Sequence, residues 1–277
     1  MNFKIVADSS ANLNTTVDRS IVSVPLTLRT DEREFVDNEA LDIKEMTDYL
    51  GSYKGKSGSA CPSSQDWVDA FGDAEEIYAV AITSNLSGSF NSLRIAKEEY
   101  VEDHPDRKVC IIDSLSAGPE LRLIIEKLQE LIADGNTYDE ICSQIQDYVH
   151  NTGLLFMLES LKNFAANGRV SPAVAKIVGL LGIRIVGKAS DAGTLEPMDK
   201  CRGEAKSLDK IVTHLKEFGL QVGKVRIAHC RNQTGAARLE NRIHSVFPKA
   251  DVKIMECRGL CSYYAESGGL LVGFEKC

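Results

Sequence analysis

The sequence predicts an α/β protein with two domains. The length of 277 residues suits two medium-sized domains that share a cleft. Strand-like and helix-like segments alternate along the chain, which is typical of βαβ units and a mostly parallel sheet. The pattern of apolar and polar residues changes near residues 151–153. We therefore expect an N-terminal α/β domain over 1–152 and a C-terminal α/β domain over 153–277.

The first half of the chain supplies most of the evidence for a parallel sheet. Short apolar runs predict strands, and apolar residues at helical spacing predict helices. Ser63 or Ser64, just after Pro62, can cap one of these helices. In order, we expect strands at 3–10 and 20–30, helices at 40–53 and 63–74, a strand at 77–82, a helix after 89, a strand at 108–114, and helices at 119–135 and 137–152.

The second half begins with a long apolar stretch. We expect a helix from 154 that ends at a turn formed by Asn167 and Gly168. A second helix should start with Ser171 as N-cap and Pro172 at its first position, and end at Gly182. The remaining predictions are a strand at 183–188, a turn at 191–193, a helix at 205–218, a strand at 224–230, a helix at 234–247, and strands at 250–257 and 268–276.

Three predicted strands end in hydroxyl-rich loops, at 8–10, 84–89 and 113–116. In a parallel sheet these loops share one edge, where ligands bind. The loop at 84–89 also opens a helix, whose first N–H groups and dipole favour an anion. A second interpretation is that Ser87 or Ser89 only caps that helix. Both interpretations stand at this point.

Composition and charge argue against several functions. The fractions of hydrophobic and charged residues, 43% and 26%, are those of an ordinary globular protein. A net charge of -8 without a long basic run argues against nucleic acid and against a polybasic membrane anchor. The most apolar segment, 170–187, contains Lys176 and Arg184, so we expect no membrane insertion. The start MNFKIVADSS has no apolar signal region, which predicts a cytoplasmic protein.

The eight cysteines predict neither a metal site nor a disulfide framework. They are spread along the chain without a C-x-x-C pair, whereas zinc sites need about four ligands in recognisable pairs. With no export signal, reduced thiols are expected. We predict no metal and no cofactor.

Four segments carry a family resemblance: IVADSSANL (5–13), TSNLSGSFNS (83–92), the stretch from LESLKNF to GIRIV (158–186), and GGLLVGFE (268–275). In this order they resemble the DegV family of bacterial fatty-acid-binding proteins, over nearly the whole chain. The resemblance implies a mostly parallel N-terminal sheet, a mixed C-terminal sheet and a fatty acid in the cleft between the domains. It also implies a binding protein without a catalytic nucleophile, which presents the acyl carboxylate to a separate fatty-acid kinase.

The resemblance implies a set of residues around the carboxylate. Ser87, with the backbone amides of Gly88 and Ser89, matches the head-group loop of the family. In SACP (59–62), Ser59 stands where the family has a threonine in T-S-Q-P, and Cys61 replaces an amide side chain. Arg202 stands where the family has an arginine near the head group, although an exposed charge at a helix terminus is an equally good interpretation. Arg169, in N-G-R-V-S, is interpreted as structural.

The resemblance also implies an acyl pocket and one departure from the family. The pocket is assigned to small and branched apolar residues, for which plain core packing is the alternative: Ala173, Ile177, Leu180, Leu181 and Ile183. Near the carboxyl end the family commonly has H-x-G-P-G, whereas this chain has Tyr264 and then AESG. A tyrosine hydroxyl can donate to a carboxylate, but it lacks the proton exchange of histidine near neutral pH.

Other functions remain open from the sequence. A small-substrate enzyme related to dihydroxyacetone kinase subunits would need a polar pocket and a reactive histidine, and His229 on a predicted strand is more typical of a structural residue. A hydrolase with Ser87 as nucleophile lacks the G-x-S-x-G spacing. The loops at Asp8 and Asp113 permit a cation without demanding one. A lipid-binding subfamily with a different partner is a further alternative.

Overall fold

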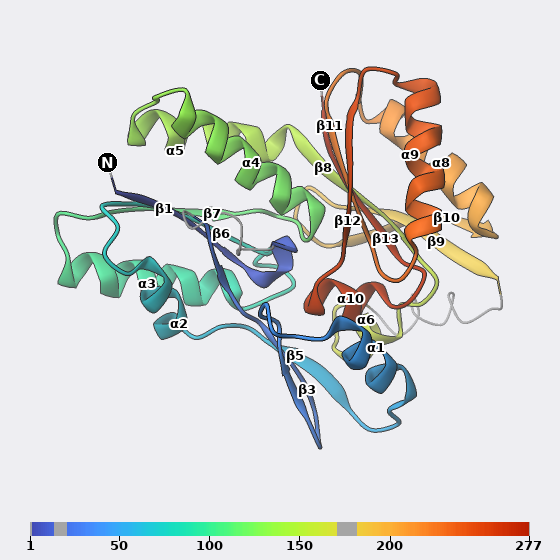
Figure 1. Cartoon of the computed structure of the whole chain (residues 1–277), viewed down its shortest axis with the longest axis horizontal. Helices are drawn as coiled ribbons and strands as arrows, with labels where there is room; N and C mark the ends of the chain where they lie inside the picture. Colours follow the sequence, from blue (N-terminus) through green and yellow to red (C-terminus); the bar gives the residue numbers. More distant parts are fainter. Residues whose placement is uncertain (1, 14–20, 171–181, 277) are drawn as a thin grey trace.

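The computed structural model describes residues 2–13, 21–170 and 182–276. Two sheets with flanking helices form the body of the molecule, and a small third sheet projects from it (Figure 1). This architecture confirms the predicted α/β class, with a parallel N-terminal sheet and a mixed C-terminal sheet. In the described part of the chain, every helix is too short or too polar to span a bilayer.

The N-terminal sheet has four strands, in the order β2-β1-β6-β7, and all of its pairs are parallel. Its strands alternate their side chains between two apolar layers, so that Ile5 and Ala7 face one layer and Val6 faces the other. Figure 1 shows α4 and α5 on one face of this sheet and α2 and α3 on the other. The elements are β1 (Phe3–Asp8), β2 (Ile21–Val24), β6 (Glu76–Ala81), β7 (Lys108–Asp113), α2 (Ser64–Phe71), α3 (Ser89–Asp103), α4 (Pro119–Ala133) and α5 (Tyr138–His150).

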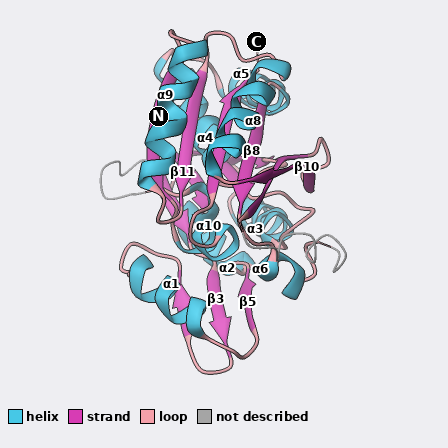
Figure 2. Ribbon diagram, turned by 90° about the vertical axis from the view of Figure 1, so that its right-hand side faces the viewer, coloured by secondary structure: helices cyan, strands magenta, loops and turns pink. Residues whose placement is uncertain are grey.

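The small third sheet was not foreseen. The single strand predicted at 20–30 is two strands, which belong to different sheets and are separated by Pro25 and Leu26. Proline has no N–H for a sheet ladder, so it marks the break. The sheet is antiparallel and lies with α1 at the bottom of Figure 2. Its elements are β3 (Thr27–Thr30), β4 (Glu34–Val36), β5 (Ser57–Ala60) and α1 (Ile43–Ser52).

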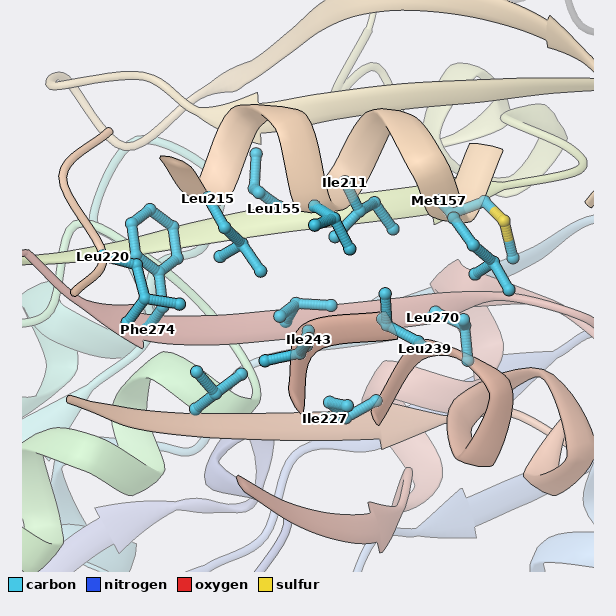
Figure 3. Packing of buried hydrophobic residues seen from close by; sticks show 14 of the residues in the cluster. Leu155, Met157, Ile211, Leu215, Leu220, Ile227, Leu239, Ile243, Leu270 and Phe274 are labelled. Carbon is cyan, nitrogen blue, oxygen red and sulfur yellow. The ribbon is translucent and has the colours of Figure 1, made fainter. Parts of the chain in front are cut away.

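The C-terminal sheet has six strands in the order β10-β9-β8-β13-β11-β12. Only the β11–β12 pair is parallel within this sheet. Two helices, α8 and α9, cover one face, and Figure 3 shows their side chains packed against it. The elements are β8 (Thr152–Leu158), β9 (Ile183–Ala189), β10 (Leu195–Arg202), β11 (Lys224–His229), β12 (Asp251–Glu256), β13 (Leu270–Glu275), α6 (Lys162–Ala166), α8 (Glu204–Glu217), α9 (Gln233–Val246) and α10 (Gly259–Ala265).

Helix α4 joins the two halves. Its apolar side chains pack into the core of the N-terminal sheet, and its first turn lies against β13 of the C-terminal sheet. Gly273 permits this approach, because a Cβ atom there would lie 2.6 Å from the backbone nitrogen of Glu120. The predicted division near residue 152 thus falls between α5 and β8, while α4 contacts both halves.

The helix predicted over 154–168 is wrong in its first part. Residues 152–158 form β8, and a helix forms only at Lys162–Ala166. The apolar run LLFML fits a buried strand as well as a helix, and β8 lies between β9 and β13 with both faces covered. Strand β10 and helix α10 were not predicted. The helix expected from Ser171 to Gly182 falls mostly outside the described residues.

Candidate ligand-binding site

A cavity with about 800 Å³ of space free of protein atoms lies between the two halves of the chain. This figure includes space that is open to solvent. Loops that follow β6 and β7 form one side, and the C-terminal sheet with α6 and α10 forms the other. Most lining residues are apolar: Leu26, Ile82, Leu86, Ala117, Leu154, Phe156, Leu158, Phe164, Ala189, Leu195, Leu260, Ala265 and Leu271.

The floor of the cavity follows from the alternation of side chains on β8. Leu154, Phe156 and Leu158 point into the cavity, whereas Leu155 and Met157 belong to the core under α8 and α9 (Figure 3). A strand that is buried on both faces carries apolar residues at every position. The same LLFML run therefore provides both the core and the cavity floor.

The turn between β9 and β10 closes one side of the cavity. Asn85 holds this turn by donating from Nδ2 to the carbonyl of Ala192 at 2.7 Å. Gly193 has a positive φ of 73° and lies against Thr83, so that a Cβ atom there would come within 2.2 Å of the threonine Oγ1. Only glycine meets both requirements. The turn thereby joins the C-terminal sheet to the loop after β6.

Polar groups converge at one part of the cavity wall. The hydroxyls of Ser59 on β5 and Tyr264 on α10 are 2.9 Å apart. Burial raises the pKa of Tyr264, while the bond to Ser59 and the charge of Arg169 oppose this shift. The Tyr264 hydroxyl therefore stays protonated at neutral pH and is able to donate. A ring contact with Phe164, at 4.7 Å between centroids, fixes the tyrosine.

Arg169 is the one charged side chain among the described residues that line the cavity. Its Nε donates to the carbonyl of Leu86 at 3.1 Å, and its Nη1 donates to the carbonyl of Asn167 at 2.6 Å. The first bond ties it to the residue before Ser87 in the loop at 84–89, which we call the serine loop. The bond to Asn167 agrees with the structural role expected for Arg169. The sequence analysis did not predict that this cation also lies on the cavity wall with Ser87 and Tyr264.

The serine loop is held from beneath by Asp8. Ser89 is fully buried, and its hydroxyl donates to Asp8 at 2.7 Å. Asp8 also accepts from the amide of Ile82 at 2.9 Å. Burial raises the pKa of Asp8, and these hydrogen bonds oppose the increase. The Ser89 side chain thus anchors the loop and does not line the cavity.

Neither serine caps α3 in the predicted way. The N-cap is Gly88, which makes no side-chain cap bond, and the Ser87 hydroxyl accepts from the amide of Ser89 at 3.2 Å. Ser87 lines the cavity and also an outer polar groove. Gly88 lines only that groove. A Cβ atom added to Gly88 would lie 3.1 Å from the sulfur of Cys61. The first turn of α3 therefore borders both spaces.

Of the six predicted head-group residues, the structure brings Ser59, Ser87 and Tyr264 to the cavity. Arg202 does not line it: this exposed residue ends β10, in register with Ile183 at the start of β9. Ile183 is half-buried and also lies off the cavity. The other predicted acyl-pocket residues, Ala173, Ile177, Leu180 and Leu181, lie outside the described residues.

Metal chemistry finds no support in the described part of the chain. There, no three His, Cys, Asp or Glu side chains are grouped so that they could hold a metal ion. The seven described cysteines are free thiols. His229, on β11, does not line the cavity.

Comparison with known proteins gives a consistent result over the full length. A model of the DegV family, described as uncharacterised proteins, matches residues 2–276. A DegV domain-containing protein of Streptococcus pneumoniae strain R6 is 44% identical over 279 residues, which cover 99% of both chains.

Two solved structures are similar in both sequence and fold. One is a DegV family protein from Eubacterium eligens loaded with heptadecanoic acid, with a TM-score of 0.97, 42% identity and coverage of 99% of this chain and 100% of that one. The other is the fatty acid kinase B3 protein of S. pneumoniae loaded with linoleic acid, with a TM-score of 0.97, 44% identity and full coverage of both chains.

Proposed function

This chain belongs to the DegV family, and we propose that it binds one long-chain fatty acid in the cavity between its two halves. The observation that carries the proposal is the apolar cavity with Ser59, Ser87, Tyr264 and Arg169 at its wall. The two similar structures, which hold heptadecanoic acid and linoleic acid, support the same ligand class.

The energetics of an acyl chain fit such a cavity. Each buried methylene contributes roughly 0.8 kcal/mol, so a chain of ordinary length gains on the order of 10 kcal/mol before the costs of binding. A carboxylate must be hydrogen-bonded when it leaves water. The hydroxyls of Ser59, Ser87 and Tyr264 supply donors, and Arg169 supplies a positive charge nearby.

We assign the carboxylate to the Ser59, Ser87 and Tyr264 end of the cavity. Ser87 also lines the outer groove, together with Gly88, Asn91 and Arg94. A carboxylate at Ser87 would thus lie where the enclosed cavity meets an open polar surface. This arrangement suits the presentation of the carboxylate to a second protein.

That second protein is, in our proposal, an ATP-dependent fatty-acid kinase, and the likeness to the kinase B3 protein supports it. The chain itself would act as the binding subunit and not as the enzyme, and this role suits a cytoplasmic location. Among the described lining residues there is no histidine or carboxylate to serve as a base. Arg202 stays a candidate for contact with the partner, since it is exposed and away from the cavity.

The alternative of a small-substrate enzyme is less favoured. Small polar substrates need many hydrogen-bonding groups, whereas this cavity offers mostly leucine, alanine and phenylalanine side chains. Its lining also lacks, in the described residues, the histidine on which such an enzyme would depend.

The test is native mass spectrometry of the purified protein, followed by solvent extraction. We expect one fatty acid per chain, which exchanges with added heptadecanoic acid. A protein that stays empty after incubation with fatty acids would contradict the proposal. A kinase-coupled assay, with and without this chain, then tests the presentation step separately.

A further inference from the structure

Above β9, the floor of the cavity is formed by a side chain of the neighbouring strand β8. Gly187 pairs with Phe156 across the β8–β9 ladder, and the phenylalanine ring lies over the glycine. A Cβ atom on Gly187 would come within 2.4 Å of the ring carbon Cζ. The ring of Phe156 and the backbone carbonyl of Glu196, which would lie 2.5 Å from that Cβ atom, together occupy the space that a β9 side chain would fill.

The neighbouring lining residues lie at the end of β9 and the start of β10. Ala189 and Leu195 line the cavity directly, whereas Gly187 does not, because the Phe156 ring covers it. Phe156 is 2% exposed, and its other cross-strand neighbour is Leu271, which also lines the cavity. One aromatic ring, that of Phe156, thus separates the cavity from Gly187 of β9.

We propose that Phe156 is a specificity-determining residue. It makes the cavity select slender, unbranched acyl chains over chains whose methyl branch lies where the chain passes over β8 and β9. This inference rests on the proposed function. Packed apolar sites have little tolerance for an added methyl group, since neighbouring side chains must shift to admit it. The ring is held between Leu271 and the backbone of β9, so it has little room to move away.

The test uses isomers of one carbon count. Heptadecanoic acid competes with a series of methylhexadecanoic acids, in which one methyl branch moves along the chain. After incubation with the protein, the bound acids are extracted and quantified by gas chromatography. We expect the wild type to favour the linear acid by about tenfold or more at one range of branch positions, the discrimination typical of one misplaced methylene.

Phe156→Ala opens the space over Gly187 and should reduce that discrimination at least about tenfold, at those branch positions only. Phe156→Leu should give an intermediate value. Leu155→Ala is the matched control on the same strand, because it faces the opposite core and should leave the selection unchanged. Leu158→Ala also enlarges the cavity, but two residues away, so it should affect other branch positions.

Several results would overturn the inference. One is a folded Phe156→Ala protein that binds heptadecanoic acid with unchanged selection. Another is an equal change at every branch position, or the same change in Leu155→Ala, which would indicate general loosening. A wild type that binds no fatty acid at all would instead refute the proposed function, and the inference with it.

Discussion

The two faces of the six-stranded sheet differ in chemistry. The face under α8 and α9 is packed with apolar side chains, such as Leu155, Ile227 and Phe274 (Figure 3). The opposite face carries the cavity and, under α4, the buried charge of Arg226. One face therefore stabilises the C-terminal half, while the other joins it to the rest of the chain.

This difference indicates which face of the sheet can hold a ligand. A filled apolar face has a unique packing, so it tolerates few changes. The other face includes unfilled space and polar contacts between segments far apart in sequence, where a ligand can be accommodated. Substitutions on the two faces should accordingly separate stability from binding.

Arg226 should give the largest loss of stability. Its side chain is 1% exposed and pairs with Glu126 of α4 at 2.7 Å and with Asp251 at 2.8 Å. Arg226→Ala leaves Glu126 mostly buried without this partner, and we expect a loss of about 4 kcal/mol in the free energy of unfolding. Urea denaturation measures it.

The control for Arg226 is the double variant Arg226→Met/Glu126→Gln. It removes both charges, so it should recover most of the loss. A single variant that loses less than about 1 kcal/mol would show that the buried pair contributes little to the joint between the halves.

Leu155 and Leu154 provide the direct comparison of the two faces. Leu155→Ala opens a void in the filled core and should cost about 3 kcal/mol of stability, with little change in fatty-acid affinity. Leu154→Ala, which enlarges an existing cavity, should cost less stability but weaken binding. Thermal unfolding and calorimetric titration with hexadecanoic acid measure both. Equal effects of the two substitutions on stability and on binding would refute the functional difference between the faces.

Much of this architecture could be predicted from residue patterns. The parallel sheet followed from β1, β6 and β7, since each is a short apolar run that leads into a polar loop. Strand β8 could not be assigned in the same way, because a run such as LLFML lacks the alternation that distinguishes a strand from a helix. Strand β10, with the sequence LEPMDKCR, is polar and lies at a sheet edge, so it had no apolar signal.

The site was partly predictable for a related reason. Ser59, Ser87 and Tyr264 follow from local motifs and lie in the cavity wall. The cavity floor depends on which residues of β8 share a face, and this pattern is hidden once the segment is assigned to a helix. Arg202 illustrates another limit, because its distance from the cavity depends on strand pairing that no local motif specifies.

Glu120, in the helix that joins the two halves, should make the free energy of unfolding depend on pH. Burial raises its pKa to about 7, while the hydrogen bond from Thr152 opposes the shift. Between about pH 4.5 and 7, the Glu120 carboxyl is ionised in the unfolded chain but still protonated in the folded protein. The contribution of Glu120 to stability therefore falls as the pH rises through this range. Glu120→Gln should therefore gain roughly 2 to 3 kcal/mol at pH 8 relative to the wild type, and about nothing near pH 4.

Urea denaturation at several pH values tests the Glu120 prediction. Glutamine keeps an oxygen that can accept from Thr152, whose hydroxyl lies 2.7 Å from Glu120 Oε1, so the geometry of the contact is retained. Parallel stability curves of the two proteins across this pH range would mean that Glu120 is ionised in the folded state without a penalty.

Ser87→Ala should have the smallest effect, confined to the head-group end of the cavity. Loss of one hydrogen bond to a charged group weakens binding of hexadecanoate by about 2 kcal/mol, or roughly 30-fold. Stability should change little, because within the described part of the chain the Ser87 hydroxyl accepts a single hydrogen bond, from the amide of Ser89. Ser84→Ala is the control, since Ser84 lines the outer groove and not the cavity. The methyl ester of hexadecanoic acid should bind wild type and Ser87→Ala equally, because it lacks the charge. If the acid also binds both proteins equally, the carboxylate does not lie at Ser87, and the polar end of the cavity must be assigned to other residues.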